Sequence, residues 1–304
     1  MQSQRSGSES SSASSSSRRG TTSLRAATLQ RLVAALPSRY EFRSEIGAGG
    51  AAHVFLVHDS ERKRLVAIKI LRPEVTTAIG RKRFLREIEI IHKLQHPNVL
   101  PMLDSGTVSG QVFFTTPYVE GDTLEMKIRR EHRLTLADTV SIASDVAAAL
   151  DYAHARGLIH RDIKPANILL NGNQAVVADF GIARAVAVKR DDAITISGVS
   201  LGTAQYMSPE QCSAVRELDQ RTDVYAFGCV VYEMLTGDPP FTGPSEQAIL
   251  ARHCAEAPRS MRTVRPELPR RVDGVVMKSL AKVRSHRYRS AGEFFDALDA
   301  GARS

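Results

Sequence analysis

The chain is organised around one stretch of sequence, which reads His160-Arg161-Asp162-Ile163-Lys164-Pro165-Ala166-Asn167 and is followed closely by Asp179-Phe180-Gly181. Asp162 can accept a proton from an incoming hydroxyl group, and Lys164 can neutralise charge on a phosphoryl group during its transfer. Asn167 and Asp179 offer the hard oxygen ligands that Mg²⁺ prefers. Because phosphoryl transfer depends mainly on positioning and charge stabilisation, these residue types in this order indicate that chemistry. The alternative, an ordinary loop that holds two carboxylates, is disfavoured because both motifs fix several residues at set offsets.

Both motifs resemble those of the protein kinases, whose catalytic loop runs H-R-D-x-K-x-x-N and whose metal-binding motif is D-F-G. Three further details resemble the bacterial Hanks-type (eukaryotic-like) serine/threonine protein kinases: Ala166, Gly181-Ile182-Ala183-Arg184 and Gly202-Thr203-Ala204-Gln205-Tyr206. The resemblance covers roughly residues 40–300. It implies an α+β, two-lobed protein-kinase fold. A small, mostly β N-lobe with one key helix would span residues 40–118, and a larger, mostly helical C-lobe residues 119–300.

The overall composition is that of a soluble globular protein, since 42% of the 304 residues are hydrophobic, 24% are charged and the mean hydropathy is -0.19. No apolar run approaches the length of a membrane-spanning helix, and the N-terminus lacks the apolar segment of a secretion signal. The three cysteines, Cys212, Cys229 and Cys254, form no C-x-x-C pair. We therefore expect a reduced, cytoplasmic chain without a membrane span or a metal knuckle.

The net charge of +8 and the pI of about 9.6 raise nucleic acid as a partner. Residues 1–35, however, contain five arginines and one glutamate, so half of the excess charge lies in this short segment. No stretch interleaves aromatic with basic residues, and tryptophan is absent. We therefore expect a solvated basic tail and no nucleic-acid partner.

The residue pattern along the chain predicts its secondary structure. Residues 1–23 are dominated by serine and should be disordered. Residues 24–39 are predicted to form a short amphipathic helix and linker that either packs on the following domain or lies free. Alternating and β-branched runs predict strands at residues 40–46, 53–58, 65–71, 100–106 and 111–116. Helical periodicity predicts helices at residues 81–95, 136–156, 219–236, 245–254, 272–281 and 291–300.

A glycine-rich turn joins the first two predicted strands and reads Ile46-Gly47-Ala48-Gly49-Gly50-Ala51-Ala52-His53-Val54. Glycine lets a backbone approach phosphate groups closely and present N–H donors to them, although flexible turns look alike. Lys69 ends the run Val66-Ala67-Ile68-Lys69 on the next strand, and the resemblance implies that it pairs with the α- and β-phosphates of ATP. By the same resemblance Glu87 holds Lys69, and a solvated helix face is the alternative for this glutamate. Ala52 replaces the family's third glycine, which restricts the loop modestly.

The resemblance also implies which residues bind the adenine ring. Thr116 would be the gatekeeper, Pro117 would offer its carbonyl oxygen, and Val119 would offer its N–H group. Proline lacks only the N–H group, so both bonds to adenine survive. Three apolar side chains would sandwich the ring: Val54, Ala67 and Leu169. Each of these three is equally suited to a plain core position.

The segment that ends in Ser208-Pro209-Glu210, a variant of the family's A-P-E motif, resembles the substrate-binding platform of the kinases. The resemblance implies that Thr203 bonds near the catalytic residues and marks specificity for serine and threonine. It also implies that Glu210 pairs with Arg287, although the proline common before that arginine is missing. Asp223 would hold the backbone of the catalytic loop.

Kinases with an arginine at the position of Arg161 typically use it to bind a phosphate on the activation segment. Thr195 and Ser197 are the best candidates to carry this phosphate, with Ser200 nearby, and exposed loop hydroxyls without a role are the alternative. The expected activity is transfer of the γ-phosphoryl group of ATP to serine and threonine hydroxyls of proteins. Mg²⁺ would be the metal, with Mn²⁺ as a substitute, and autophosphorylation would occur in a transient homodimer.

Two alternative functions share this fold. A pseudokinase that binds ATP as a signalling scaffold would be expected to have lost Lys69, Asp162, Asn167 or Asp179, and none of them is lost. Small-molecule kinases that phosphorylate antibiotics lack both the lysine two residues after the catalytic aspartate and the substrate platform. Both features are present here, so the sequence favours a protein kinase.

Overall fold

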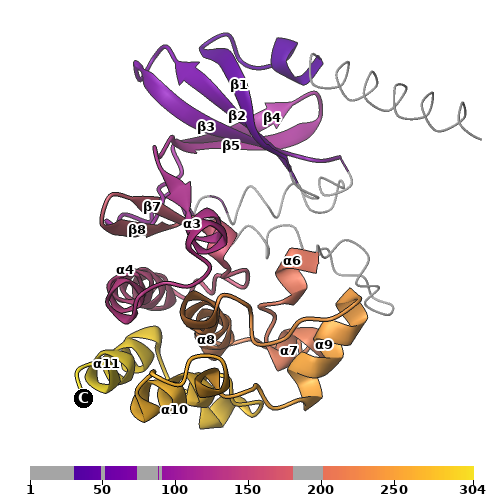
Figure 1. Cartoon of the computed structure of the whole chain (residues 1–304). Coiled ribbons are helices and arrows are strands. Elements are labelled where there is room, and N and C mark those ends of the chain that lie inside the picture. Colours follow the sequence, from indigo (N-terminus) through magenta and orange to yellow (C-terminus); the bar gives the residue numbers. More distant parts are fainter. Residues whose placement is uncertain (1–30, 49–51, 74–87, 89–90, 181–200) are drawn as a thin grey trace, which may run out of the picture.

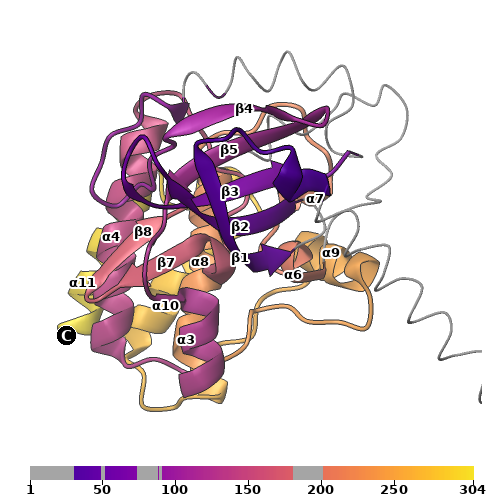
Figure 2. The same cartoon turned by 90° about the horizontal axis from the view of Figure 1, so that it is seen from above.

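The computed structural model describes residues 31–48, 52–73, 88, 91–180 and 201–304. These residues form a β-sheet lobe and a larger, mostly helical lobe (Figure 1), and the sheet lies over the helices when the molecule is seen from above (Figure 2). The predicted α+β, two-lobed fold is therefore confirmed. Several expectations lie outside the described residues: the disordered tail 1–23, Gly49, Gly50, Ala51, Glu87, Thr195, Ser197, Ser200 and most of the helix expected at residues 81–95.

Five antiparallel strands form the sheet of the N-lobe in the order β1-β2-β3-β5-β4. Their bounds are Tyr40–Ala48 (β1), Ala52–Asp59 (β2), Arg64–Leu71 (β3), Asp104–Val108 (β4) and Gln111–Pro117 (β5). The register places Val54 opposite Lys69 and Ala67 opposite Thr116. Opposite residues of an antiparallel pair share one face, and so do residues two apart on a strand. These four side chains therefore lie on the same face of the sheet.

The strand expected at residues 100–106 begins only at Asp104. Val99 instead forms a bridge with Val177, and the Leu100 N–H donates to the Val177 carbonyl at 2.9 Å. The expectation was wrong for residues 100–103, because Leu100 pairs with the C-lobe and the chain reaches the N-lobe sheet only at Leu103, whose N–H donates to the Thr115 carbonyl at 2.8 Å. Val177 is the last residue of β8 (Gln174–Val177). This strand forms a small sheet with β6 (Asp122–Thr123) and β7 (Ile168–Asn171), which the sequence pattern did not predict.

The described helices of the C-lobe are α3 (Leu124–Glu131), α4 (Leu136–His154), α6 (Leu201–Ala204), α7 (Pro209–Cys212), α8 (Arg221–Thr236), α9 (Glu246–Ala255), α10 (Arg270–Ser279) and α11 (Ala291–Ala302). The helices predicted between residues 136 and 300 are all present, with ends shifted by about two residues at most. Helices α3, α6 and α7 were not predicted, because one or two turns carry little periodicity. None of the helices in the described ranges is long and apolar enough to cross a membrane.

Helix α8 is the centre of the C-lobe. All its residues from Thr222 to Leu235 are buried, and α4, α10 and α11 pack around it. Gly228 allows the closest of these contacts, because a Cβ atom there would lie 2.1 Å from Ser279 Oγ at the end of α10. The helix ends at Gly237, whose φ of 94° suits glycine. This buried helix carries Asp223 and Glu233 into the site described below.

The chain segment before Tyr40 packs on the N-lobe. Residues 31–34 form a helical turn, and Leu32 and Leu36 keep only 3% and 9% of their surface exposed. Both belong to one apolar cluster with side chains of the sheet: Tyr40, Phe55, Val57, Val66, Ile68, Ile70, Val108 and Phe113. Arg39 extends this contact, because its guanidinium group pairs with Asp104 and Glu61. The sequence left docking or a free helix open, and the structure shows docking for residues 31–36.

We expect Leu32→Ala to lower the free energy of unfolding by about 2 kcal/mol, because it removes buried apolar surface and leaves a cavity. Denaturant titration followed by circular dichroism measures this change. Met126→Ala is the matched control, since Met126 is 51% exposed on α3 and its loss should change stability by less than about 0.5 kcal/mol. Equally small effects of both substitutions would show that the N-terminal turn does not stabilise the domain.

Candidate active site

Asp223 on α8 anchors the catalytic loop, residues 160–167. Its carboxylate accepts hydrogen bonds from the backbone N–H groups of His160 at 2.7 Å and Arg161 at 2.8 Å. It also contacts His154 Nε2 at 2.7 Å. Burial alone would raise the pKa of Asp223, but the hydrogen bonds and the neighbouring imidazoles outweigh burial and lower this pKa. Arg161 has a φ of 69°, a strained backbone conformation that these bonds stabilise. Asp223 therefore holds the loop backbone, as the resemblance implied.

Four of the predicted catalytic and metal-binding side chains meet in one cluster. Lys164 Nζ donates to Asp162 Oδ2 at 2.8 Å and to Thr203 Oγ1 at 2.9 Å. Asn167 Nδ2 donates to the Asp162 backbone carbonyl at 2.7 Å and to Asp162 Oδ2 at 3.1 Å. Because Thr203 lies on α6, these bonds join the catalytic loop to the substrate platform. The Asp162 side chain remains 24% exposed, so a hydroxyl group from outside can reach it.

A second cluster connects the two lobes. Lys69 Nζ on β3 lies 2.5 Å from Asp179 Oδ2, just beyond β8. Burial by itself would raise the pKa of Asp179, but the Lys69 ammonium, with smaller contributions from His160 and Lys164, lowers it. Asp179 is therefore ionised at neutral pH. The sequence did not predict this pairing, because it assigned Lys69 to phosphates and to Glu87.

Asn167 and Asp179 are suited to hold a metal ion. The Asn167 amide nitrogen is bonded to Asp162, so the amide carbonyl oxygen is the atom that can face a cation. The Asp179 carboxylate carries a negative charge, as described above. An anionic carboxylate and an amide oxygen are the hard donors that Mg²⁺ prefers, and Mg²⁺ typically completes its shell with water and phosphate oxygens. The residues present therefore fit Mg²⁺ bound together with a phosphorylated ligand.

The side chains predicted to bind adenine alternate with core residues along their strands. Four of them are partly exposed: Val54, Ala67, Thr116 and Leu169. Each of them has a neighbour along its strand that is almost completely buried. These neighbours are, in the same order, Phe55, Ile68, Thr115 and Ile168. Because successive residues of a strand point to opposite faces, the four partly exposed side chains point away from the core. This observation favours a ligand-facing position over the core alternative.

The remainder of the predicted nucleotide site is less uniform. Ile46, Gly47 and Ala48 lie at the end of β1 and are exposed or partly exposed, and Pro117 and Val119 are partly exposed at the end of β5 and just beyond it. In contrast, Ala52 and His53 begin β2 with buried side chains. His53 Nδ1 lies 3.3 Å from Glu45 Oε1 on β1. Both side chains are therefore packed within the N-lobe and are not presented to a ligand.

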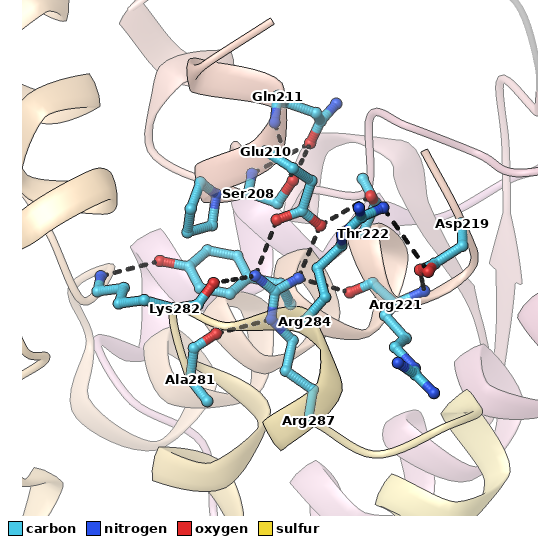
Figure 3. Close-up of polar contacts among 12 residues, drawn as sticks. Ser208, Glu210, Gln211, Asp219, Arg221, Thr222, Ala281, Lys282, Arg284 and Arg287 are labelled. Carbon is cyan, nitrogen blue, oxygen red and sulfur yellow. Dashed lines mark hydrogen bonds and ion pairs between the residues drawn. The ribbon is translucent and has the colours of Figure 1, made fainter. Parts of the chain in front are cut away.

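The substrate platform is tied to the C-lobe by Glu210 and Arg287 (Figure 3). Arg287 Nη1 and Nη2 donate to the two Glu210 oxygens at 2.7 Å and 2.8 Å, and Thr222 Oγ1 donates to the same carboxylate at 2.9 Å. Arg287 also donates to three backbone carbonyls, those of Ala281, Lys282 and Arg221. Burial alone would raise the pKa of Glu210, but Arg287 outweighs burial and lowers it. The predicted pair is present although the proline is missing.

Gln211 completes this platform, and the sequence analysis missed it. Its Nε2 donates to the Arg161 carbonyl at 2.9 Å, which joins α7 to the catalytic loop. Its Oε1 accepts from the Ser208 N–H at 3.1 Å, while the Gln211 N–H donates to Ser208 Oγ, so the two residues form a capping box. The spacing Ser208-Pro209-Glu210-Gln211 is the signal that could have revealed this helix start.

Glu233 is a second residue that the sequence analysis missed. Tyr206, three residues after Thr203, donates its hydroxyl hydrogen to Glu233 Oε2 at 2.6 Å in a buried environment. Burial raises the pKa of Glu233 to about 7, and the charges of Glu125 and Asp238 add to this rise. A carboxylate in the apolar run of α8 is the signal that could have identified it, because an acidic side chain inside a buried helix needs a partner.

Comparisons with known proteins agree with this geometry. The family model described as "Protein kinase domain" matches residues 40–291. The serine/threonine-protein kinase PknB of Mycobacterium tuberculosis (strain ATCC 25618 / H37Rv) is 39% identical over 264 residues, which cover 85% of this chain and 42% of PknB. The probable serine/threonine-protein kinase PknB of Bifidobacterium longum is 41% identical over 270 residues, which cover 84% of this chain and 38% of the relative. The chain thus spans less than half the length of these curated relatives.

A solved structure shows the same likeness. The kinase domain of Mycobacterium tuberculosis PknI, crystallised as a mutant, is 30% identical and superimposes with a TM-score of 0.71 over 88% of this chain and 98% of that domain. The family match covers most of the chain, including the catalytic loop and the platform. This chain therefore belongs to the protein-kinase family, within its bacterial Hanks-type serine/threonine group.

Proposed function

We propose that this chain is a serine/threonine protein kinase that transfers the γ-phosphoryl group of ATP to hydroxyl groups of proteins. One observation carries the proposal: Lys164 binds both the Asp162 carboxylate and the Thr203 hydroxyl. Asn167 donates to the same carboxylate, and its backbone carbonyl accepts from the N–H of Ala178, the residue before Asp179. A proton acceptor, a cation for phosphate and two metal ligands are thereby close together. Phosphoryl transfer needs these parts and little covalent help from the protein.

In the proposed mechanism, Asp162 orients the substrate hydroxyl and accepts its proton as the oxygen attacks the γ-phosphorus. Lys164 stays bonded to Asp162 and neutralises negative charge on the phosphoryl group during transfer. Lys69 binds the α- and β-phosphates. Asn167 and Asp179 would hold Mg²⁺, or Mn²⁺ in its place, which supplies positive charge to the phosphates when bound.

The nucleotide is proposed to lie between lobes that span residues 40–118 and 119–300. Thr116, the Pro117 carbonyl and the Val119 N–H group would meet the adenine edge at the end of β5. The partial exposure of Val54, Ala67 and Leu169 supports their assignment to the adenine faces. We also propose that the substrates are proteins and that the chain acts in the cytoplasm. Thr195 or Ser197 would be autophosphorylated in a transient homodimer.

Incubation of the purified chain with γ-labelled ATP, Mg²⁺ and a generic protein substrate tests the proposed activity. We expect label on serine and threonine, and we expect Lys69→Met to reduce transfer by at least ~100-fold, because the α- and β-phosphates lose their cation. Mass spectrometry of the chain itself should find phosphate on Thr195, Ser197 or both. Nucleotide binding without any transfer to protein or to the chain would instead support the pseudokinase alternative.

A further inference from the structure

Two of the three cysteines, far apart in sequence, lie together in the fold. Cys212 ends α7, and Cys254 is the penultimate residue of α9. Cys254 Sγ lies 3.9 Å from the Pro209 carbonyl at the start of α7 and 3.7 Å from Ser213 Oγ just after it. Cys212 packs against an apolar cluster that includes Ile249 and Leu250 of α9. The Cys254 thiol therefore contacts both ends of α7, and the Cys212 side chain packs against α9.

The surroundings of the two thiols overlap. Cys254 Sγ contacts Ser213, the residue next to Cys212, and burial, with a smaller contribution from the nearby Cys254, raises the pKa of Cys212 to about 12. A disulfide needs Cα atoms within about 7 Å of each other and side chains that point together. The two helices are adjacent, and Cys254 contacts the residue that follows Cys212, so the pair is well placed to meet this requirement.

The surroundings distinguish the two thiols in reactivity. Cys254 is exposed, whereas Cys212 is partly buried. Lys282 Nζ donates to the Arg252 carbonyl, two residues before Cys254, at 3.4 Å. Oxidation requires that peroxide reach the sulfur, so the exposed thiol reacts before the partly buried one. Cys254 should therefore react first, and Cys212 should resolve the product.

We propose that Cys212 and Cys254 form a reversible intramolecular disulfide when the protein meets hydrogen peroxide. In the first step the Cys254 thiolate attacks peroxide, the O–O bond breaks, and a sulfenic acid and hydroxide form; the hydroxide takes up a proton to become water. In the second step the Cys212 sulfur attacks the sulfenic sulfur, the S–O bond breaks, and the hydroxyl group leaves as water with the Cys212 proton. Two thiols are oxidised and one peroxide is reduced to two waters.

The bridge would act on the substrate platform. Helix α7 is fixed to the catalytic loop by Gln211 and to the C-lobe by Glu210, while α9 supports α6, which carries Thr203. Closing the two sulfur atoms to an S–S bond of about 2.05 Å pulls α9 toward α7 and shifts this support. We therefore expect the bridge to lower kcat/KM for a protein substrate by at least threefold. The KM for ATP should not change, because the bridge has no contact with Lys69 or Asp179.

Peptide mapping under non-reducing conditions tests the bridge without reference to kinase activity. After peroxide treatment, we expect the tryptic peptides 191–216 and 253–259 to be joined, and dithiothreitol to separate them. Cys229 is the internal control, because it is buried in α8 on the separate peptide 222–252 and should stay a thiol. Cys254→Ser, at an exposed position, should abolish the joined peptide and keep the fold. Sulfinic Cys254 without a bridge, or a bridge between two chains, would overturn the proposal.

The consequence for substrates rests on the proposed kinase function and is measured separately. Steady-state kinetics with a protein substrate are compared for the reduced chain, the bridged chain and peroxide-treated Cys254→Ser. We expect only the bridged chain to lose activity and dithiothreitol to restore it. A bridged chain with unchanged kcat/KM would overturn the effect on the platform. If no form of the chain transfers phosphate, the proposed function fails, whereas the joined peptide still decides the proposed bridge.

Discussion

Replacing Asp162 with asparagine should lower the turnover of phosphoryl transfer by about 10²- to 10⁴-fold, while nucleotide binding stays close to normal. The carboxylate is held by Lys164 and Asn167 and remains partly exposed, so it is oriented toward an incoming hydroxyl group. Asparagine has nearly the same shape but cannot accept the proton. The Lys69–Asp179 pair, assigned here to phosphates and metal, is not altered by the substitution.

Two measurements separate the proton-accepting role of Asp162 from a structural one. Calorimetric titration with ATP and Mg²⁺ measures nucleotide binding, and labelled-ATP kinetics measure turnover. Asp296→Asn is the matched control, because Asp296 is exposed on α11, away from the catalytic loop, and its loss should leave both quantities unchanged. If Asp162→Asn weakens nucleotide binding as much as turnover, Asp162 mainly supports the loop and is not the base.

The catalytic loop could be predicted from sequence because its chemistry is local. Asp162, Lys164 and Asn167 lie within six residues, so their offsets nearly fix their mutual geometry once the loop is anchored. The partner contacts with Thr203 and Asp223 were available through the family resemblance, and both are present. A contact between residues far apart in sequence can thus be predicted when both residues belong to family motifs with a known role.

Other contacts could not be predicted, because no local pattern encodes them. Gln211 reaches the Arg161 carbonyl only after α7 has packed against the catalytic loop. Cys212 and Cys254 are separated by all of α8 and most of α9, and the sequence offers no spacing rule for such a pair. The docking of Leu32 depends on apolar side chains of strands that follow it in the chain. These contacts arise when helices and strands pack together, whereas the sequence predicts each helix or strand by itself.

The ends of elements were missed for a similar reason. Residues 99 and 100 have the apolar character of a strand, but they pair with Val177 of the C-lobe instead of extending β4. Apolar alternation reports that a strand-like segment is half buried, and it does not report which sheet buries it. Strand β6 has only two residues, and the four-residue strands β7 (Ile168–Asn171) and β8 (Gln174–Val177) do not alternate between apolar and polar residues, so no pattern indicated them.

Replacing Arg287 with alanine should destabilise the protein by about 3–5 kcal/mol, because it leaves the Glu210 carboxylate buried without its cation. Arg287 is only 3% exposed and Glu210 only 6%, and the two form a bidentate pair (Figure 3). The substitution also leaves three backbone carbonyls without their donor. Thermal unfolding measures the change, and a drop of several degrees in Tm is expected at this chain length.

The matched control is Arg129→Ala, which removes an exposed arginine paired with Glu125 on α3. Such i,i+4 pairs contribute about 0.2–0.5 kcal/mol, so the Tm should hardly move. A double substitution, Arg287→Ala with Glu210→Gln, should recover part of the loss, since the second change removes the unpaired buried charge. If Arg287→Ala and Arg129→Ala lower the Tm equally, the buried pair does not hold the platform.

The pH dependence of stability gives an independent test of the same pair. The folded-state pKa of Glu210 lies below its ordinary value, so the folded protein binds fewer protons at this site than the unfolded chain. The stabilisation from Glu210 is therefore complete above the ordinary pKa of a glutamate and is lost as the pH falls through the lowered folded-state value. Glu210→Gln removes this titration. The difference in Tm between wild type and Glu210→Gln should shrink as the pH is lowered, and a constant difference would show that Glu210 does not titrate with unfolding.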